Sequence, residues 1–461
     1  MKTRATVVTI AVLLLMLSLA NALAACGGTT QPGPSASASP PTATSTFPST
    51  PAGSQLAWVV DRINAGQAVG AAVVAQHFSP AFLAQVPAAQ LNAALSKLVA
   101  AAPLRLAGVI GASSPTALVT HLVGASGTSL NATITVAPAP PHLIVGLLFR
   151  PHAATAVPTD WHQVDAGLRA LAGHASLLAS EVGGKTPIDS LRPDAPGAIG
   201  SAFKLYVLGA LASAIEHHSA SWNEQLAIHP GWKSLPSGDL RNARDGRRYA
   251  LRYYAQQMIA VSDNTAADHL IHRLGRSAVE AELARLGMRE PLLDTPFLTT
   301  RELFALKLSA PAALRDAYAS GGAAQRRRLL TRIDTLPVSL AAAASWTAPR
   351  EVGTIEWFAS PADLARAMIA LQAAAQRPGR APIREILARN PGITFSKTRW
   401  PYVAFKGGSE PGVLSLTWLL RRSDGRTFVL SIVLNDSTKA IDEASAVGIA
   451  EGAVNLLAKA R

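Results

Sequence analysis

The sequence is poor in cysteine, in charged residues and in aromatic residues, and these shortages exclude several classes of protein. A single cysteine, Cys26, among 461 residues rules out an internal disulfide. Because 49% of the residues are hydrophobic and only 15% are charged, the chain is not disordered overall. Apart from its first segment, no run is long and apolar enough to suggest a membrane element. The length is sufficient for two globular domains and extensions.

Acidic residues are also few, since 29 Asp and Glu stand against 42 Lys and Arg, and the net charge is +13. The only basic cluster lies at residues 325–330, and no basic run alternates with aromatic residues. We therefore expect no nucleic-acid partner. The excess charge is interpreted as a solvated face that is favourable near anionic polymers of a cell envelope.

The N-terminus, residues 1–26, has the layout of a secretory signal. Lys2 and Arg4 precede the apolar run 7–19, and small residues follow it. The segment ends in Leu-Ala-Ala-Cys at Cys26, which resembles the bacterial lipobox. That resemblance implies lipidation of Cys26 and an extracytoplasmic protein that is lipid-anchored to the bacterial cell membrane. An ordinary signal peptide with an incidental cysteine is the alternative.

Two regions follow the signal. Residues 27–54 are mostly Ser, Thr, Pro, Gly and Ala, and they are predicted to be a disordered linker because they cannot bury enough apolar surface to fold. Residues 55–150 are predicted to be a small α+β domain, since helical patterns precede four short stretches rich in Val, Ile, Leu and Thr. We find no acid–base pair in this domain. A boundary is expected at 151–160.

The larger domain is predicted at residues 160–461. A strand is expected at 174–183, a helical region at 201–390, and a hairpin around the Ser-Asp-Gly-Arg turn that begins at Ser423. An amphipathic helix ends the chain. The pattern therefore predicts an α+β two-domain protein whose second domain has an antiparallel sheet built from both chain ends and a helical body between them.

Lysine is scarce, since only 10 of the 42 basic residues are lysines, so a lysine in an apolar helix is informative. Ser201 and Lys204 are spaced i and i+3 and share one helix face within residues 197–214. A serine hydroxyl needs a base to become a nucleophile, and Lys204 can serve if burial lowers its pKa toward neutrality. A helix-capping Ser201 is the alternative.

The tripeptide Ser262-Asp263-Asn264 interrupts two helical patterns and is predicted to form a turn between helices. Ser262 is a candidate proton relay to a leaving nitrogen. Asn264 is a candidate hydrogen-bond partner for a substrate amide, and Asp263 is expected to brace the turn. A capping turn without any chemistry is the alternative.

The third group is Lys406-Gly407-Gly408-Ser409, at the end of a predicted strand. Glycines would let a substrate lie against the strand edge, and the ammonium group of Lys406 would hold a carboxylate. Two other lysines, Lys185 and Lys397, do not begin a strand pair and are less suitable.

These three groups, in this order, resemble the class A β-lactamase and penicillin-binding-protein superfamily over about residues 160–461. The resemblance implies a class A β-lactamase-like fold with Ser201 as the acylated nucleophile and Lys204 as its base or proton partner. It further implies Ser262 as the proton relay and Lys406 as the carboxylate and electrostatic site. The oxyanion hole would be formed by the backbone N–H groups of Ser201 and Ser409.

The complete layout is similar to the β-lactamase-like protein of the clavulanic acid cluster and its actinobacterial lipoprotein relatives. In that group the small N-terminal α+β domain is similar to ketosteroid isomerases and polyketide cyclases. This is a resemblance of fold only.

The sequence departs from the superfamily at two points. Gly407 replaces a threonine whose hydroxyl would help to bind a carboxylate, and Ser409 is a candidate replacement. No Glu-x-x-Leu-Asn loop supplies a deacylating base. Glu351 and Glu356 are the better candidates for this base, and Glu302 is a weaker one.

We therefore expect a serine hydrolase for an ester or amide substrate, β-lactam or peptide-like and bearing a carboxylate, that is a poor β-lactamase. A binding or sensory lipoprotein that keeps the fold without catalysis is the alternative. No cofactor and no metal are expected, because His269 and His272 have the i, i+3 spacing of ligands but no third ligand accompanies them.

Overall fold

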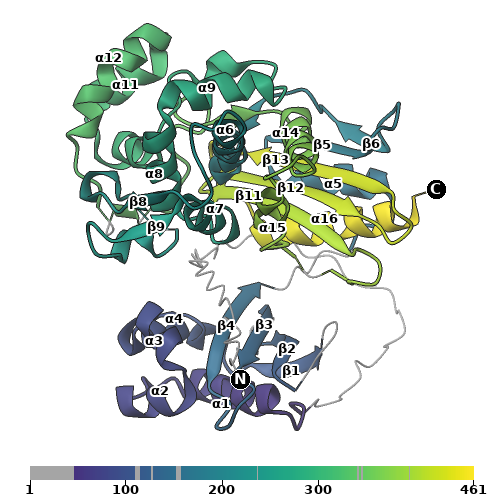
Figure 1. Cartoon of the computed structure of the whole chain (residues 1–461). Helices are drawn as coiled ribbons and strands as arrows, with labels where there is room; N and C mark the ends of the chain where they lie inside the picture. Colours follow the sequence, from purple (N-terminus) through teal and green to yellow (C-terminus); the bar gives the residue numbers. More distant parts are fainter. Residues whose placement is uncertain are drawn as a thin grey trace, which may run out of the picture. The chain divides into compact units, whose positions relative to one another are not determined.

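The computed structural model describes residues 46–109, 115–125, 128–151, 157–235, 237–339, 342–343, 346–393 and 395–460. The chain divides into two compact units, Met1–Ala154 and Thr155–Arg461 (Figure 1). Cys26, the signal segment and residues 27–45 of the predicted linker lie outside the described residues. Within the described part, no helix has both the length and the apolar character needed to cross a membrane.

The described residues of the first unit form four α-helices and an antiparallel sheet in the order β1-β2-β3-β4, as the meander pattern predicts. Its elements are α1 (Pro51–Ala65), α2 (Ala71–His77), α3 (Pro80–Gln85), α4 (Ala88–Ser96), β1 (Arg105–Val109), β2 (Ala117–Val123), β3 (Ser129–Val136) and β4 (Ile144–Pro151). Alternate residues of β2 and β3 are buried against the helices, with Leu118, Leu122 and Ile134 in one core with Leu56 of α1. The prediction of an α+β domain is confirmed.

The predicted end of the linker at residue 54 is wrong. Helix α1 begins at Pro51, because the side chain of Thr50 accepts a hydrogen bond from the backbone N–H of Gly53 and a proline occupies the first helical turn. Local capping thus extends the helix into a segment whose composition alone indicates a linker.

The second unit contains a five-stranded antiparallel sheet in the order β11-β12-β13-β5-β6. Its strands are β5 (His174–Glu181), β6 (Asp189–Leu191), β11 (Tyr402–Glu410), β12 (Val413–Arg421) and β13 (Thr427–Asn435). Strand β5 pairs with β13, so that Leu177 lies opposite Ile432. The sheet is therefore built from both ends of the unit, as predicted.

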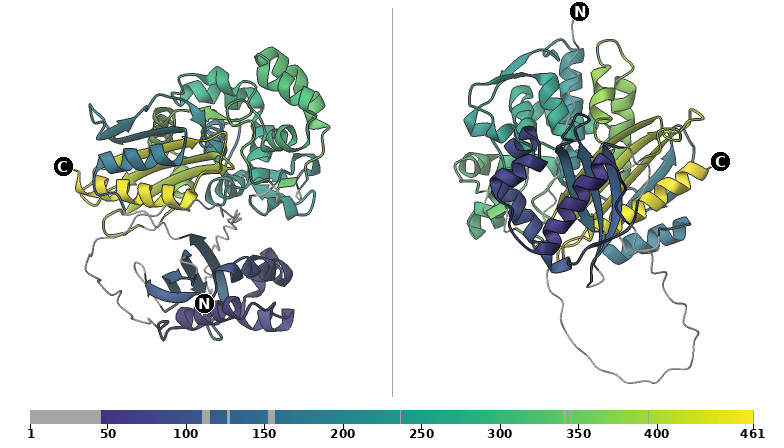
Figure 2. Two further views of the ribbon diagram at one scale, coloured as in Figure 1. Left: turned by 180° about the vertical axis from the view of Figure 1, so that it is seen from behind. Right: turned by 90° about the horizontal axis from the view of Figure 1, so that it is seen from below.

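One face of this sheet is covered by α5 (Trp161–Leu171) and α16 (Glu443–Lys459), as Figure 2 shows. Val164 and Leu168 of α5 and Leu457 of α16 are buried in one core with Trp418 and Ile432 of the sheet.

The other face packs against the helical body. Its helices are α6 (Lys204–Glu216), α7 (Leu251–Ala260), α8 (Asn264–Leu274), α9 (Arg276–Arg285), α10 (Thr300–Phe304), α11 (Ala312–Ser320), α12 (Ala323–Asp334), α14 (Pro361–Ala374) and α15 (Pro382–Leu387). Helix α6 is buried along its first nine residues, Lys204 to Ala212, and all of these except Lys204 are apolar, Tyr or Gly, as is typical of a buried helix. The turn before α6 contacts β11, so the N-terminus of this helix lies beside the sheet.

Candidate active site

Ser201 lies in a tight turn that precedes α6. Strand β7 (Gly197–Ala198) pairs with β10 (Phe358–Ala359), and the N–H of Ile199 donates to the carbonyl of Trp357 at 2.9 Å. Gly200 then adopts φ +46°, which favours glycine, and starts the 3₁₀ turn η2 (Gly200–Phe203). Neither η2 nor α6 has a side-chain cap, so the alternative that Ser201 is only a helix cap is excluded.

Lys204 has no exposed surface, and its amine contacts four oxygens. These are Ser201 Oγ at 3.1 Å, Ser262 Oγ at 3.0 Å, the Ser262 carbonyl at 2.6 Å and Asn264 Oδ1 at 2.6 Å. The last two oxygens can only accept, so they take two N–H donors. A neutral amine then has a lone pair left, which can accept the Ser201 hydroxyl proton.

The electrostatic surroundings favour that neutral amine. Burial lowers the pKa of Lys204 well below 10.5, and the positive charge of Lys406 lowers it further. Asp263 and Asp268 oppose the shift, but they are the lesser causes. The predicted juxtaposition of a serine and a buried lysine is therefore present.

Ser262 and Asp263 lie in the turn between α7 and α8, as predicted, and Asn264 is the first residue of α8. Ser262 has φ +57°, a strained left-handed conformation, and both its hydroxyl and its carbonyl contact Lys204. The buried Asp263 carboxylate accepts from the N–H groups of Ala266 at 2.8 Å and Leu240 at 2.9 Å. Asp263 thus braces the turn.

Asn264 is 5% exposed and contacts Lys204 directly. Its Oδ1 accepts from the Lys204 amine, and its Nδ2 donates to the Leu235 carbonyl at 3.2 Å. Asn264 therefore positions Lys204. Because Nδ2 carries a second hydrogen, the role of Asn264 in binding a substrate amide stays a prediction.

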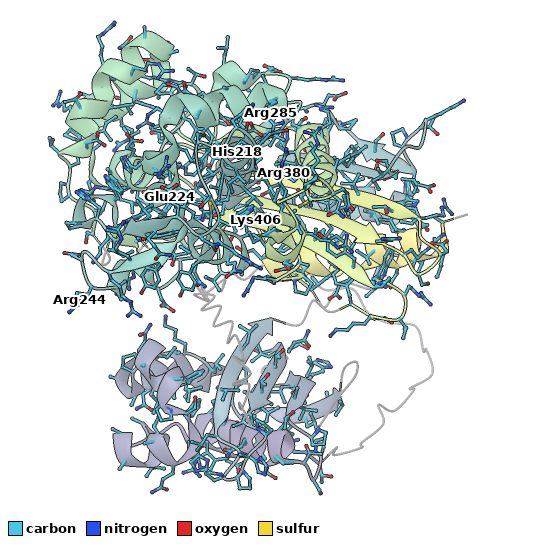
Figure 3. The ribbon with its side chains drawn as sticks, in the orientation of Figure 1. His218, Glu224, Arg244, Arg285, Arg380 and Lys406 are labelled. Atoms are coloured by element: carbon cyan, nitrogen blue, oxygen red, sulfur yellow. The ribbon has the colours of Figure 1, made fainter. Side chains whose placement is uncertain are left out.

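Lys406 reaches the same turn from β11, at the border between sheet and helical body (Figure 3). Its amine donates to Ser262 Oγ at 3.1 Å and to the Gly407 carbonyl, and burial lowers its pKa to about 7. A continuous chain of contacts thus links Ser201, Lys204, Ser262 and Lys406.

The glycines of β11 serve the protein's own backbone. A Cβ atom on Gly408 would lie 2.3 Å from the Ser201 nitrogen, and one on Gly200 would lie 3.2 Å from the Ser409 nitrogen. Gly407 faces the Phe405 ring and the Ser415 carbonyl. The expectation that these glycines make room for a substrate is therefore corrected for Gly407 and Gly408. The close approach of β11 to the Ser201 turn at Gly408 and Gly200 brings the backbone amides of Ser201 and Ser409 near each other.

The three candidate bases are all engaged elsewhere. Glu302 caps α10 and pairs with Arg276, Glu351 pairs with Arg315, and both oxygens of Glu356 have partners. In the part of the chain that the structure describes, no carboxylate hydrogen-bonds to Ser201. The sequence did not predict the buried ion cluster of Lys307, Glu356 and Glu410. The scarcity of lysine is nevertheless a signal that applies to Lys307 as it does to Lys204.

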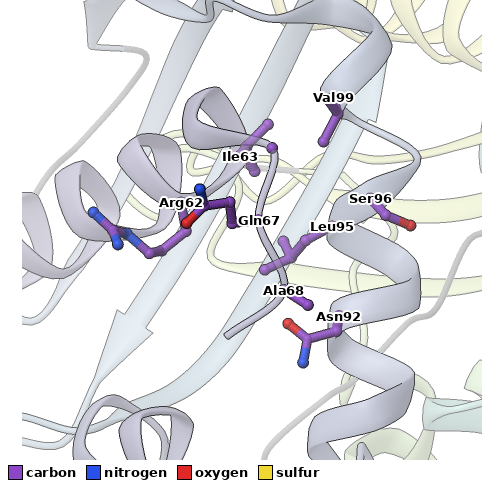
Figure 4. A pocket seen from close by; sticks show the side chains of 9 residues that line it. Arg62, Ile63, Gln67, Ala68, Asn92, Leu95, Ser96 and Val99 are labelled. Atoms are coloured by element: carbon purple, nitrogen blue, oxygen red, sulfur yellow. The ribbon is translucent and has the colours of Figure 1, made fainter. Parts of the chain in front are cut away.

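Two further sites offer no chemistry. His269 Nε2 accepts from the His229 N–H and Nδ1 contacts the Thr265 carbonyl, so neither ring nitrogen is available to a metal. The first unit has a pocket between the end of α1 and α4 (Figure 4). Arg62 is the one charged side chain among its nine described lining residues, so the pocket holds no acid–base pair.

The β-lactamase enzyme family matches residues 163–457, and the family described as the N-terminal part of the ORF 12 gene product matches residues 47–138. No curated protein matches.

Three solved structures that are similar to this chain match it over about two thirds of its length. The β-lactamase from Sphaerobacter thermophilus is 20% identical, with 64% of this chain and 97% of that chain covered and a TM-score of 0.45. The putative class A β-lactamase PenP from Rhodopseudomonas palustris is 15% identical, with coverages of 65% and 98% and a TM-score of 0.46. PBP-A is 15% identical, with coverages of 66% and 100% and a TM-score of 0.44.

Proposed function

Because the chain belongs to the β-lactamase enzyme family, we propose that it is a serine hydrolase that an ester or amide substrate acylates at Ser201. The observation that carries this proposal is the contact of 3.1 Å between Ser201 Oγ and the fully buried amine of Lys204. Burial lowers the pKa of this lysine, and a neutral amine is the form that can accept a proton.

In the proposed reaction, Lys204 takes the proton of Ser201 while Oγ forms a bond to the substrate carbonyl carbon. The carbonyl oxygen becomes negative and is held by the amides of Ser201 and Ser409. The intermediate collapses when the bond to the leaving nitrogen or oxygen breaks. That atom receives the proton from Lys204 through Ser262, whose hydroxyl contacts both lysines. Water then hydrolyses the acyl ester on Ser201.

The substrate class follows from the charges around Ser201. Lys406 supports the choice of a carboxylate-bearing small molecule or peptide-like compound, which includes β-lactams. Ser409, three residues further along the same strand, is exposed. No described carboxylate hydrogen-bonds to Ser201, so no described carboxylate is placed to act as a base in the hydrolysis of the acyl ester. We propose slow deacylation and therefore poor β-lactamase activity.

The cellular location is proposed from the sequence. The lipobox-like segment supports export and lipidation at Cys26, with the folded units extracytoplasmic and lipid-anchored to the membrane. No nucleic acid enters this proposal.

The test is covalent labelling of Ser201, followed by intact mass, with a fluorescent penicillin and a fluorophosphonate. We expect one adduct on the wild type, none on Ser201→Ala and much slower labelling of Lys204→Ala. Ser190→Ala, which alters an exposed serine of β6, is the matched control and should label normally.

A binding or sensory lipoprotein is the second candidate, favoured by the same lack of a described carboxylate at Ser201. Failure of every acylating probe to form an adduct on the wild type would refute the hydrolase and leave this candidate.

A further inference from the structure

Lys307, Glu356 and Glu410 form a buried cluster, which we call the ion clasp. The Lys307 amine donates to Glu356 Oε1 at 2.6 Å and to Glu410 Oε1. The side chains of Lys307 and Glu356 are completely buried, and that of Glu410 is 9% exposed. The three residues lie far apart in sequence, in the π-helical turn η6 (Ala305–Ser309), just before β10 and at the end of β11.

The Glu356 side of the ion clasp adjoins the Ser201 turn. Glu356 precedes Trp357 and accepts from its N–H at 3.2 Å. The Trp357 carbonyl in turn holds the N–H of Ile199, and its indole ring stacks on Phe203 with centroids 3.9 Å apart. Both ends of the turn that carries Ser201 thus rest on the residue next to Glu356.

The Glu410 side adjoins the same turn from the opposite direction. Residues two apart on a strand share a face, so Lys406, Gly408 and Glu410 face the helical body together. Gly408 lies against the Ser201 nitrogen. Ser201 therefore faces the strand between Lys406 and Glu410.

The charges make the ion clasp sensitive to the loss of any member. Burial raises the pKa of Glu410 well above 4.5, and the charge of Glu356 adds to this shift. Burial lowers the pKa of Lys307, but the two glutamates more than offset this and raise it above 10.5. The Glu410 carboxyl therefore takes up a proton more readily than a free carboxyl does. Replacing Glu356 by glutamine removes a charged acceptor of the Lys307 ammonium, and replacing Lys307 leaves the two buried glutamates without their cation.

We propose that the ion clasp positions the two backbone segments on either side of Ser201, and so sets the rate of acylation without touching the substrate. The inference rests on the proposed acylation of Ser201. Lys307 joins the segment before β10, which holds Ile199 and Phe203, to the end of β11, which supplies Ser409. A displacement of either segment would separate the amides of Ser201 and Ser409.

The test compares Glu356→Gln with Glu282→Gln. Glu282 is also buried, at 3% exposure, and pairs with one arginine, but it lies on α9. Each variant should lower the melting temperature. Acylation by the fluorescent penicillin is measured at a temperature below both melting temperatures and at several probe concentrations. The concentration dependence gives the non-covalent affinity and the acylation rate separately. We expect at least a tenfold lower acylation rate with unchanged affinity for Glu356→Gln only.

A third variant separates positioning from stability. Lys307→Met/Glu356→Gln/Glu410→Gln has no buried charge, so its melting temperature should recover relative to Glu356→Gln. We expect its acylation rate to stay at least tenfold below that of the wild type. A wild-type rate in Glu356→Gln or in the triple variant, or an equal loss in Glu282→Gln, overturns the inference. Absence of labelling on the wild type contradicts the proposed function itself.

Discussion

Gly408→Ala tests the close approach of β11 to the Ser201 turn. The added methyl group would lie 2.3 Å from the Ile199 carbonyl, 2.3 Å from the Ser201 nitrogen and 2.7 Å from the Ala202 nitrogen. All three atoms belong to backbone, so no side-chain rotation relieves the contact, and strand and turn must separate by about 1 Å to restore ordinary contact distances. Overpacking of this kind costs about 1–3 kcal/mol of unfolding free energy.

The same displacement should also lower the acylation rate. A shift of about 1 Å in a reacting group typically lowers a rate about 100-fold. We expect this loss in the acylation rate of Gly408→Ala with a penicillin probe, measured by stopped flow or by mass. Gly173→Ala is the control, because a Cβ atom there meets nothing within 4 Å. Labelling of Gly408→Ala at the rate of the control would refute the close approach.

Two predictions concern pH. Lys204→Arg should abolish acylation at every pH, because a guanidinium does not lose its proton. The acylation rate of the wild type should rise with pH as Lys204 loses its proton, and it should fall above about pH 7 as Lys406 loses its charge. A pH–rate profile checks this, and a rate that still rises above pH 9 contradicts it. Burial, with the nearby Asp165 charge, raises the pKa of Asp189 to about 6. Its stabilising contribution is therefore complete below about pH 3.8 and is lost as the pH rises through 6. Denaturant unfolding at pH 4 and pH 7 should show this loss in the wild type and not in Asp189→Asn; an equal pH dependence in both would contradict the assignment.

The sequence predicted the parts of the site whose signals are local. Ser201 and Lys204 are one helical turn apart, and the Ser262 turn breaks two helical patterns. Lys406 stands at the end of an alternating apolar strand. Each signal spans only a few residues, and the order of the three groups along the chain carried the resemblance to the superfamily.

The parts that the sequence did not predict depend on contacts between distant segments. Lys307 meets Glu356 and Glu410 across 49 and 103 residues, and no local pattern marks such a pair. Nothing in the sequence shows that the Asn264 amide contacts Leu235 and Lys204. The start of α1 was missed although its signal is local, because the capping Thr50 outweighs the linker-like composition around it.

The pairing of β5 with β13 has a consequence for biogenesis. Strand β5, the first strand of the sheet in the second unit, pairs with β13, which is synthesised much later. Lys406 lies on β11, which is also synthesised late. Contacts so distant in sequence form slowly. A chain that is not yet synthesised as far as β11 therefore carries Ser201 and Lys204 without Lys406, and the four side chains can meet only after β11 and β13 have been made.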